Sequence, residues 1–194
     1  MRRSSSPRAP TVVQMRVIAG RLGGRRLKAP SGTVTRPTSD RVREALFSML
    51  GNVEGASVLD MFAGTGALGI EALSRGASGV VFVERHAGAV RALRDNLRAL
   101  EIEPAQTDVR RADALTALRS ARAREETYDL VFIDPPYRRA HDLGPELSAV
   151  MPSLLRPAAR VVVESDRRAP LELGMQIEQE RRYGDTSIRI HRYQ

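Results

Sequence analysis

The chain has 194 residues, with 31 Lys and Arg against 23 Asp and Glu, a formal net charge of +8 and no cysteine. This length suits one domain with a full hydrophobic core and a small appendage. The absence of cysteine excludes disulfides, thiolate metal sites and methylation of a pyrimidine ring carbon through a cysteine nucleophile, and it agrees with a cytoplasmic protein. No apolar run is long enough to span a membrane, and no apolar segment follows the basic start as in a secretory signal.

The positive charge lies in the first quarter of the chain. Residues 1–50 hold 11 Lys and Arg against 2 Asp and Glu, whereas the remaining 144 residues hold 20 against 21. Such a basic segment is typical of a protein that binds a phosphate backbone. Residues 1–14, where Arg is mixed with Ser and Pro, instead predict a disordered, solvated tail. The candidates for nucleic-acid contact are the arginines that follow this tail: Arg21, Arg25, Arg26, Arg36, Arg41 and Arg43.

The segment after the tail predicts a small basic unit. Two short strands, at 15–20 and 25–28, flank a glycine pair and form a plausible hairpin. A helix follows Asp40 and stops at Gly51, because its apolar residues keep helical spacing. These apolar positions are Val42, Ala45, Leu46, Met49 and Leu50, and the arginines at 41 and 43 fall outside their stripe.

Strands and helices alternate from Ser57 onward. We expect strands at 57–62, 79–84, 107–112, 128–133 and 159–164, and helices at 65–75, 87–100, 113–122 and 142–155. An antiparallel pair at 176–183 and 186–193 closes the chain around a Gly-Asp turn. This order predicts an α/β fold, a Rossmann-like doubly wound sheet that is mostly parallel with a C-terminal antiparallel strand pair. The expected units are the tail 1–14, the basic hairpin and helix 15–51, and a domain at 52–194.

A glycine-rich loop after the first strand predicts a cofactor site. Gly64, Gly66 and Gly69 have the G-x-G-x-x-G spacing, and Glu84 ends the second strand about 20 residues on. The spacing alone does not separate nicotinamide dinucleotides from S-adenosylmethionine. Asp60 favours the second ligand, since a carboxylate there would face a pyrophosphate in the first case and an ammonium group in the second. For Glu84 the alternative is a solvated strand end.

Asp113 ends the third strand and has two interpretations. Its side chain could accept a hydrogen bond from an adenine amino group, or it could cap the helix that follows. Taken alone, the cap is the more common role for Asp in this position. No metal is expected, because His86, His141 and His191 are scattered along the chain.

The tetrapeptide 134–137 follows the apolar run of the fourth strand, at the edge where ligands bind in open α/β sheets. Pro135 and Pro136 stiffen the turn and remove two backbone donors. The Asp134 carboxylate and the Pro135 carbonyl can accept from an exocyclic amino group, and the Tyr137 ring can stack on its base. The alternative is an ordinary solvated turn.

Taken in order, these motifs resemble the class I S-adenosylmethionine-dependent amino methyltransferases. More narrowly, residues 36–44 and the Tyr-Gly-Asp-Thr at 183–186 resemble the bacterial 16S rRNA guanine-N2 methyltransferases, and the resemblance covers about residues 15–193. It implies methyl transfer from S-adenosylmethionine to the exocyclic N2 of a guanine in 16S rRNA, without a metal. The implied partner is 16S rRNA or the small ribosomal particle, for a cytoplasmic monomer without a membrane contact.

The resemblance also implies roles for individual residues. Asp60, Gly64 and Gly66 would hold the methionine end of the cofactor, Glu84 the ribose and Asp113 the adenine. The full implied cofactor set is Asp60, Phe62, Gly64, Gly66, Glu84, Asp113 and Ala114. The implied catalytic set is Asp134, Pro135, Pro136 and Tyr137, and the basic N-terminal arginines would contact RNA.

Other functions share parts of this pattern. A DNA adenine-N6 or cytosine-N4 methyltransferase uses the same tetrapeptide and loop, and only the flanking motifs argue for rRNA. A protein-glutamine methyltransferase does not account for the basic segment. A dinucleotide-dependent oxidoreductase leaves the tetrapeptide without a role, and a non-catalytic RNA-binding assembly factor would not need the full motif set.

Overall fold

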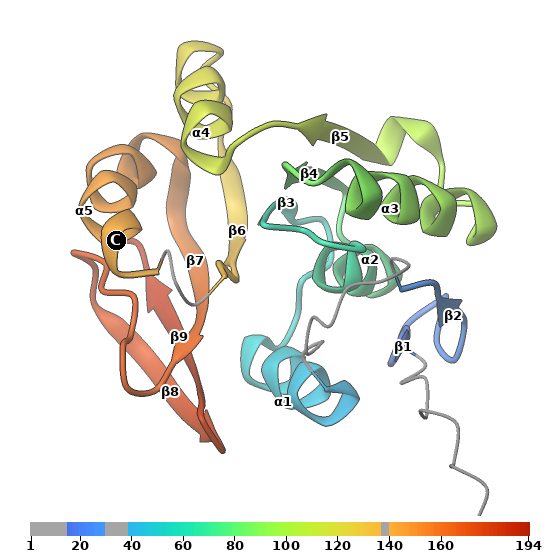
Figure 1. Ribbon diagram of the computed structural model, residues 1–194, viewed down its shortest axis with the longest axis horizontal. Coiled ribbons are helices and arrows are strands. Elements are labelled where there is room, and N and C mark those ends of the chain that lie inside the picture. The colour runs from blue at the N-terminus through green and yellow to red at the C-terminus, as the bar shows by residue number, and fades with distance from the viewer. Residues whose placement is uncertain (1–14, 30–38, 137–139) are drawn as a thin grey trace, which may run out of the picture.

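A computed structural model describes residues 15–29, 39–136 and 140–194, with backbone alone for 140–142 (Figure 1). The predicted tail, Arg36 and Tyr137 lie outside these residues. The strands are β1 (Met15–Arg16), β2 (Arg26–Leu27), β3 (Ser57–Met61), β4 (Gly79–Glu84), β5 (Thr107–Arg111), β6 (Tyr128–Ile133), β7 (Leu155–Asp166), β8 (Ile177–Tyr183) and β9 (Thr186–Arg192). The α-helices are α1 (Asp40–Leu50), α2 (Ala67–Ser74), α3 (Ala87–Ala99), α4 (Ala114–Ala123) and α5 (Ala140–Val150). Short 3-10 turns cover Pro104–Gln106 and Met151–Leu154.

Seven strands form one sheet in the order β5-β4-β3-β6-β7-β9-β8. The pairs from β5 through β7 are parallel, and β9 pairs antiparallel with both β7 and β8. The predicted α/β fold, mostly parallel with a C-terminal antiparallel pair, is confirmed. The strand order reverses between β3 and β6, which is where open α/β sheets bind their ligands.

Two hydrophobic cores cover the two faces of the sheet. Alternate strand residues, such as Val58 and Phe132, pack with α1, α2 and α3 in the first core. Their neighbours along the strands, such as Leu59 and Ile133, pack with α4 and α5 in the second. Figure 1 shows the same division, with α2 and α3 beside β3 and β4, and α5 beside β7. Burial on both faces explains why the parallel strands read as unbroken apolar runs.

The largest departure from the predicted elements lies between α5 and β7. The predicted helix 142–155 ends as an α-helix at Val150, and a 3-10 turn containing Pro152 leads directly into β7. That strand begins at Leu155, four residues before the predicted start, and its pairing with β6 shifts register between Tyr128 and Leu130. Ala158 has a φ of 64° in the same stretch. A strand start with an irregular register and a proline does not show the unbroken apolar run that marks the rest of β7.

The basic hairpin packs against α2. The Ile18 and Ala19 N–H groups donate to the Glu71 carboxylate at 2.6 and 3.0 Å, and the Leu22 N–H donates to the Ser74 hydroxyl at 3.0 Å. A Cβ at Gly20 would lie 1.9 Å from the Ser74 carbonyl oxygen, so this contact requires glycine. The strand β1 is shorter than predicted, because the Ile18 and Ala19 N–H groups donate to Glu71 and not to the partner strand.

The hairpin and α1 also share the first core with the sheet, through Met15, Val17, Leu22, Leu27, Leu46, Phe47 and Leu50. The boundary at residue 51 was predicted from a change in charge along the chain. The division of the chain into a unit at 15–51 and a domain at 52–194 stays a prediction. Within the described ranges, no helix is long and apolar enough to cross a membrane.

Candidate active site

Three glycines shape the loop between β3 and α2 and the first turn of α2. Gly64 and Gly66 have φ angles of 56° and 85°, which L side chains rarely adopt, and Gly66 caps the start of α2. A Cβ at Gly66 would lie 2.3 Å from Leu93 Cδ1, and one at Gly69 would lie 2.3 Å from Phe82 Cε1. The glycines therefore allow α2 to lie close to α3 and to the sheet. The helix begins at Ala67, two residues after its predicted start at 65.

Phe62 follows β3 with a φ of 62°. A positive φ costs an aromatic residue about 1–3 kcal/mol and is found mainly where a functional site needs a particular backbone. Its partly buried ring packs against the second core. The strained residue lies at the carboxyl end of the central strand, directly before the glycine loop.

The loop N–H groups are hydrogen-bonded to carboxylates. Gly64 N–H donates to Glu84 Oε2 at 2.9 Å, and Gly69 N–H donates to Asp60 Oδ2 at 2.9 Å. The second Glu84 oxygen accepts from the His86 N–H at 2.7 Å. An anion placed at this loop would meet two carboxylates where a dinucleotide site offers free donors, so the loop favours a cationic ligand group over a pyrophosphate.

Four carboxylates form a row across the ligand edge of the sheet: Glu84 on β4, Asp60 on β3, Asp134 after β6 and Glu164 on β7. Asp60 is 2% exposed and Glu84 and Glu164 are each 8% exposed, while Asp134 is partly exposed. Burial raises the pKa of Asp60 to about 7; the Gly69 N–H opposes this rise and the Glu84 charge adds to it. Burial, then the charges of Glu164 and Asp60, raise the pKa of Asp134 well above its ordinary value.

Glu164 is absent from the set predicted from the sequence. It ends the apolar run of β7 as Glu84 ends that of β4, so a charged residue at the carboxyl end of a parallel strand was the available signal. The predicted strand 159–164 comes after the tetrapeptide 134–137 in the chain. No recognisable motif follows this strand, so Glu164 was not singled out. The sheet order places it beside Asp134.

The other predicted site residues are placed as follows. Pro135 is buried and Pro136 is exposed at the turn after β6. Asp113 caps α4, with its carboxylate accepting from the Leu115 N–H at 3.1 Å, so the capping interpretation is confirmed and the adenine contact stays a prediction. Ala114 is buried at the start of α4.

Four of the predicted nucleic-acid contacts are exposed. They are Arg21, Arg25, Arg26 and Arg41. Arg21 Nη2 donates to Gln106 Oε1 at 3.0 Å, and Arg25 Nη2 donates to the Ala99 carbonyl at 2.7 Å. Both contacts hold the arginine stems against the α3 side of the fold and leave other guanidinium donors available.

The prediction for Arg43 is wrong, because its side chain is fully buried. Its Nη2 donates to the Arg16 carbonyl and to Asp40 Oδ1, each at 2.7 Å, and thus ties β1 to the start of α1. The helix turns its Arg43, Leu46, Phe47 and Leu50 side to the core. The apolar spacing indicated a neighbouring face, because it counted Val42 and omitted the arginine.

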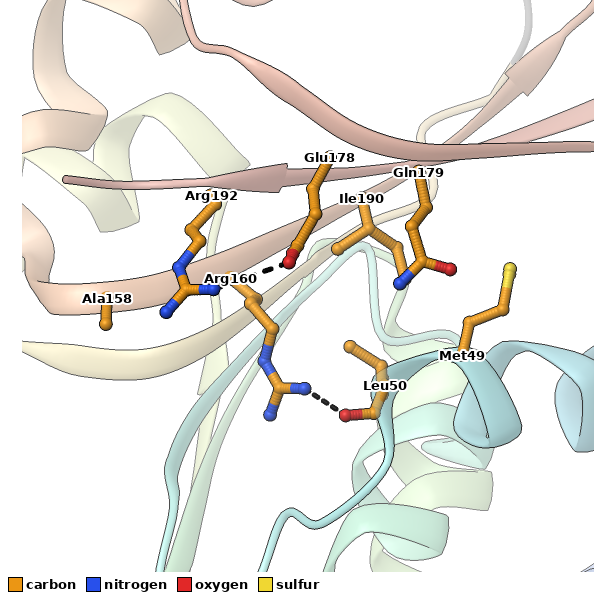
Figure 2. A pocket seen from close by; sticks show the side chains of 8 residues that line it. All are labelled: Met49, Leu50, Ala158, Arg160, Glu178, Gln179, Ile190 and Arg192. Carbon is orange, nitrogen blue, oxygen red and sulfur yellow. Dashed lines mark hydrogen bonds and ion pairs between the residues drawn. The ribbon is translucent and has the colours of Figure 1, made fainter.

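A separate pocket of about 360 Å³ lies at the other end of β7, between the end of α1 and the β8–β9 pair (Figure 2). Arg160 donates there to the carbonyls of Leu50 and Asn52. Arg192 pairs with Glu178 at 3.5 Å. The guanidinium of Arg160 therefore binds carbonyls at the carboxyl end of α1, and this pocket contains none of the four carboxylates.

Comparisons with known proteins agree with this geometry. The family model described as Conserved hypothetical protein 95 matches residues 15–192. The Bacillus subtilis protein YlbH is 39% identical over 187 residues, which cover 92% of this chain and 98% of YlbH. The Haemophilus influenzae protein named Ribosomal RNA small subunit methyltransferase D is 34% identical over 161 residues, which cover 81% of this chain and 82% of that protein.

Solved structures share the fold. The yhhF protein of Escherichia coli superposes with a TM-score of 0.79 at 34% identity, covering 93% of this chain and 98% of yhhF. A Thermus thermophilus 16S rRNA N2 G1207 methyltransferase, solved with AdoMet and guanosine, has a TM-score of 0.71 at 24% identity over 93% of this chain and 50% of that one. Because the family model spans the hairpin and the whole sheet, the chain belongs to the Conserved hypothetical protein 95 family of methyltransferases, with the small-subunit rRNA methyltransferase D of H. influenzae as a relative.

Proposed function

We propose that this protein transfers a methyl group from S-adenosylmethionine to the exocyclic N2 of a guanine in 16S rRNA. The observation that carries the proposal is the row of four carboxylates at the ligand edge, with Asp134 and the two prolines at the turn after β6. The names of its relatives support an rRNA substrate, and the neighbour solved with AdoMet and guanosine supports this pairing of cofactor and base.

The residues present suit a cofactor with a net positive charge. Asp60 would bind its ammonium group, Glu84 its ribose hydroxyls, and the tight turn at Gly64 and Gly66 would allow close backbone approach. The raised pKa of Asp60 reflects the burial of its carboxylate, with a smaller contribution from the Glu84 charge. A cation at this place would restore the charged form.

When bound, S-adenosylmethionine supplies an electrophilic methyl carbon, which the exocyclic nitrogen takes as the carbon–sulfur bond breaks and the nitrogen loses a proton. Asp134 and the Pro135 carbonyl accept the amino hydrogens and localise the nitrogen lone pair. Burial raises the pKa of Asp134, and the charges of Glu164 and Asp60, which repel its own charge, raise it further. A positive charge that develops on the nitrogen offsets this repulsion among the carboxylates and is therefore strongly stabilised by Asp134. The stiff Pro-Pro turn holds both acceptors in place. Orientation of reacting groups can lower an activation free energy by roughly 7–11 kcal/mol at most, and we expect it to contribute several kcal/mol to methyl transfer here. The proton leaves to water or to Asp134.

The proposal is tested with labelled S-adenosylmethionine and three separate pools of acceptor: small ribosomal particles, naked 16S rRNA and DNA. Label in N2-methylguanine from either rRNA pool is the expected result, and the pool that reacts faster identifies the natural acceptor. Label in DNA adenine or cytosine alone, or tight NADH binding with none for S-adenosylmethionine, contradicts the proposal.

The affinity for S-adenosylmethionine should rise with pH and level off above about 7, because Asp60 must be charged to bind the ammonium group. Calorimetric titrations in buffers of different ionisation enthalpy should detect proton release on binding near neutral pH. Asp60→Asn, which can keep the bond from the Gly69 N–H, should bind weakly and lose most of this pH dependence.

The free protein should show the opposite trend. The pKa of Asp60 is raised in the folded state, so its contribution to stability is present below the unfolded pKa of about 4 and is lost as pH rises towards 7. The free energy of unfolding should therefore decrease less between these pH values in Asp60→Asn than in the wild type. An unchanged slope would show that Asp60 does not titrate in this range.

Replacing Arg21, Arg25, Arg26 and Arg41 with Gln should weaken rRNA binding and flatten its salt dependence. Each phosphate contact contributes about 0.7 to 0.9 to the slope of log affinity against log salt. Binding isotherms at several salt concentrations measure this slope, and S-adenosylmethionine affinity should stay unchanged.

A control variant with the same change in charge replaces four exposed arginines elsewhere: Arg119, Arg122, Arg124 and Arg156. This variant should keep the wild-type slope. Equal slopes for the hairpin variant and the wild type would remove the hairpin from the RNA-binding surface. Arg36, which lies outside the described residues, is best changed singly.

A further inference from the structure

Glu164 and Asp134 lie side by side on neighbouring strands. Ile133 and Val163 pair in parallel register, so the next residue on each strand is Asp134 and Glu164. Side chains at matched positions of parallel strands point to the same face, about 4.8 Å apart along the hydrogen-bonding direction. That face is the one of Phe132 and Asp60, since residues two apart on a strand share a face.

The pair is built into the end of the site that the target base would use. Glu164 is 8% exposed, and its charge is one of the causes of the raised pKa of Asp134. Asp60 and Glu84, which would hold the cofactor, lie on the other side of Asp134 in the strand order. Two neighbouring carboxylates and the Pro135 carbonyl therefore lie beyond the cofactor end, which is one acceptor group more than the two hydrogens of an amino group occupy.

The three bases that carry an exocyclic amino group differ beside that group. Guanine has the N1–H donor next to its N2 amino group, so its Watson–Crick edge presents two adjacent donors. Adenine has the N1 lone pair and cytosine the N3 lone pair next to the amino group. Two adjacent carboxylates match guanine, and with adenine or cytosine one of them would face a lone pair without a donor between them.

We propose that Glu164 is a specificity-determining residue of this site, whose carboxylate accepts the N1–H of the target guanine while Asp134 and the Pro135 carbonyl accept the amino hydrogens. The inference rests on the proposed function and extends it to the choice of base. Glu164 makes no bond to the transferred methyl group. It selects guanine because adenine and cytosine would place a ring nitrogen lone pair, and not an N–H donor, against its carboxylate.

The test compares guanosine with 2-aminopurine riboside, which keeps the 2-amino group and has no hydrogen on N1. Both nucleosides are titrated into the full-length protein saturated with S-adenosylhomocysteine, with binding followed by NMR or by 2-aminopurine fluorescence. The wild type should prefer guanosine by about tenfold or more, as expected for one selective hydrogen-bonded pair.

Glu164→Gln should bring this preference close to one, because the amide can accept from guanosine or donate to N1 of 2-aminopurine. Its affinity for S-adenosylhomocysteine should match the wild type, which shows that the variant is folded. Glu178→Gln is the matched control, since it makes the same chemical change at an exposed position in the separate pocket. It should keep the wild-type preference.

A wild-type protein that does not bind guanosine more tightly than 2-aminopurine riboside contradicts the assignment, and so does an unchanged ratio in Glu164→Gln. These titrations involve no methyl transfer, so they separate the role of Glu164 from the proposed function. A protein with the expected preference that fails to label rRNA would keep Glu164 as the guanine selector and lose the rRNA substrate.

Discussion

Replacing Asp134 with Ala is expected to lower the single-turnover rate of methyl transfer by about 10²-fold or more, the scale of a lost oxyanion-type contact. The reason is that Asp134 would contact the amino group as positive charge develops on it, while Asp60 and Glu84 would hold the cofactor. S-adenosylmethionine affinity should change little, since the proposed cofactor contacts are those of Asp60 and Glu84. Single-turnover rates at saturating cofactor, combined with calorimetric titration, measure the two quantities separately.

Asp134→Asn is the conservative control, because it keeps an acceptor oxygen and removes the charge. Its rate should fall between those of the wild type and Asp134→Ala. Equal losses of rate and cofactor affinity in the alanine variant would make Asp134 a structural or cofactor-binding residue. A rate that stays within a few fold of the wild type would move the chemistry away from the tetrapeptide.

Apart from the start of β7, the strands of the sheet and the cofactor loop could be predicted from the sequence to within one or two residues. Parallel strands that are buried on both faces read as continuous apolar runs, and glycines with positive φ mark the turns that follow them. Thus β4 at 79–84 and β6 at 128–133 agree with the predicted bounds. The same reasoning places Asp60, Glu84 and Asp134 at one edge, because the carboxyl ends of parallel strands share that edge.

The remaining features depend on contacts between distant segments. Arg43 was assigned to RNA on charge alone, while its burial depends on the Arg16 carbonyl of a hairpin 27 residues earlier. Glu164 gains its neighbour only through the order of β6 and β7 in the sheet. Glu71 anchors the hairpin through N–H groups more than 50 residues away, in a helix where its carboxylate reads as an ordinary polar residue. Periodicity carries no information on such pairings.

Asn96 joins the hairpin to the cofactor loop, and its substitution should have the largest effect on stability. Its side chain belongs to α3 and is 1% exposed. Oδ1 accepts from the Lys28 N–H at 2.8 Å, and Nδ2 donates to the carbonyls of Lys28 and Thr65 at 3.2 and 3.1 Å. One buried amide therefore holds the end of the basic hairpin and the residue between Gly64 and Gly66.

Asn96→Asp keeps the shape of the side chain and replaces the shared donor with an oxygen that faces two carbonyls. We expect the free energy of unfolding at neutral pH to fall by about 3 kcal/mol or more, because a charge is then buried with the Lys28 N–H as its remaining donor and its second oxygen faces two carbonyls. The new carboxyl would have a raised pKa in the folded state, so the deficit should shrink as pH falls and the protonated group regains one donor. Denaturant titrations at neutral and acidic pH measure this difference.

The same variant should lose affinity for S-adenosylmethionine, since the Thr65 carbonyl no longer has a donor to hold the loop. Glu71→Gln is the control, because Glu71 anchors the hairpin at Ile18 and Ala19 and has no hydrogen bond to the glycine loop. It should loosen the hairpin and weaken rRNA binding while cofactor affinity stays close to the wild type. If both variants lower cofactor affinity equally, the hairpin as a whole supports the loop and Asn96 has no separate part in it. If Asn96→Asp lowers stability alone, the amide is a structural link and the cofactor loop holds its shape through its glycines and carboxylates.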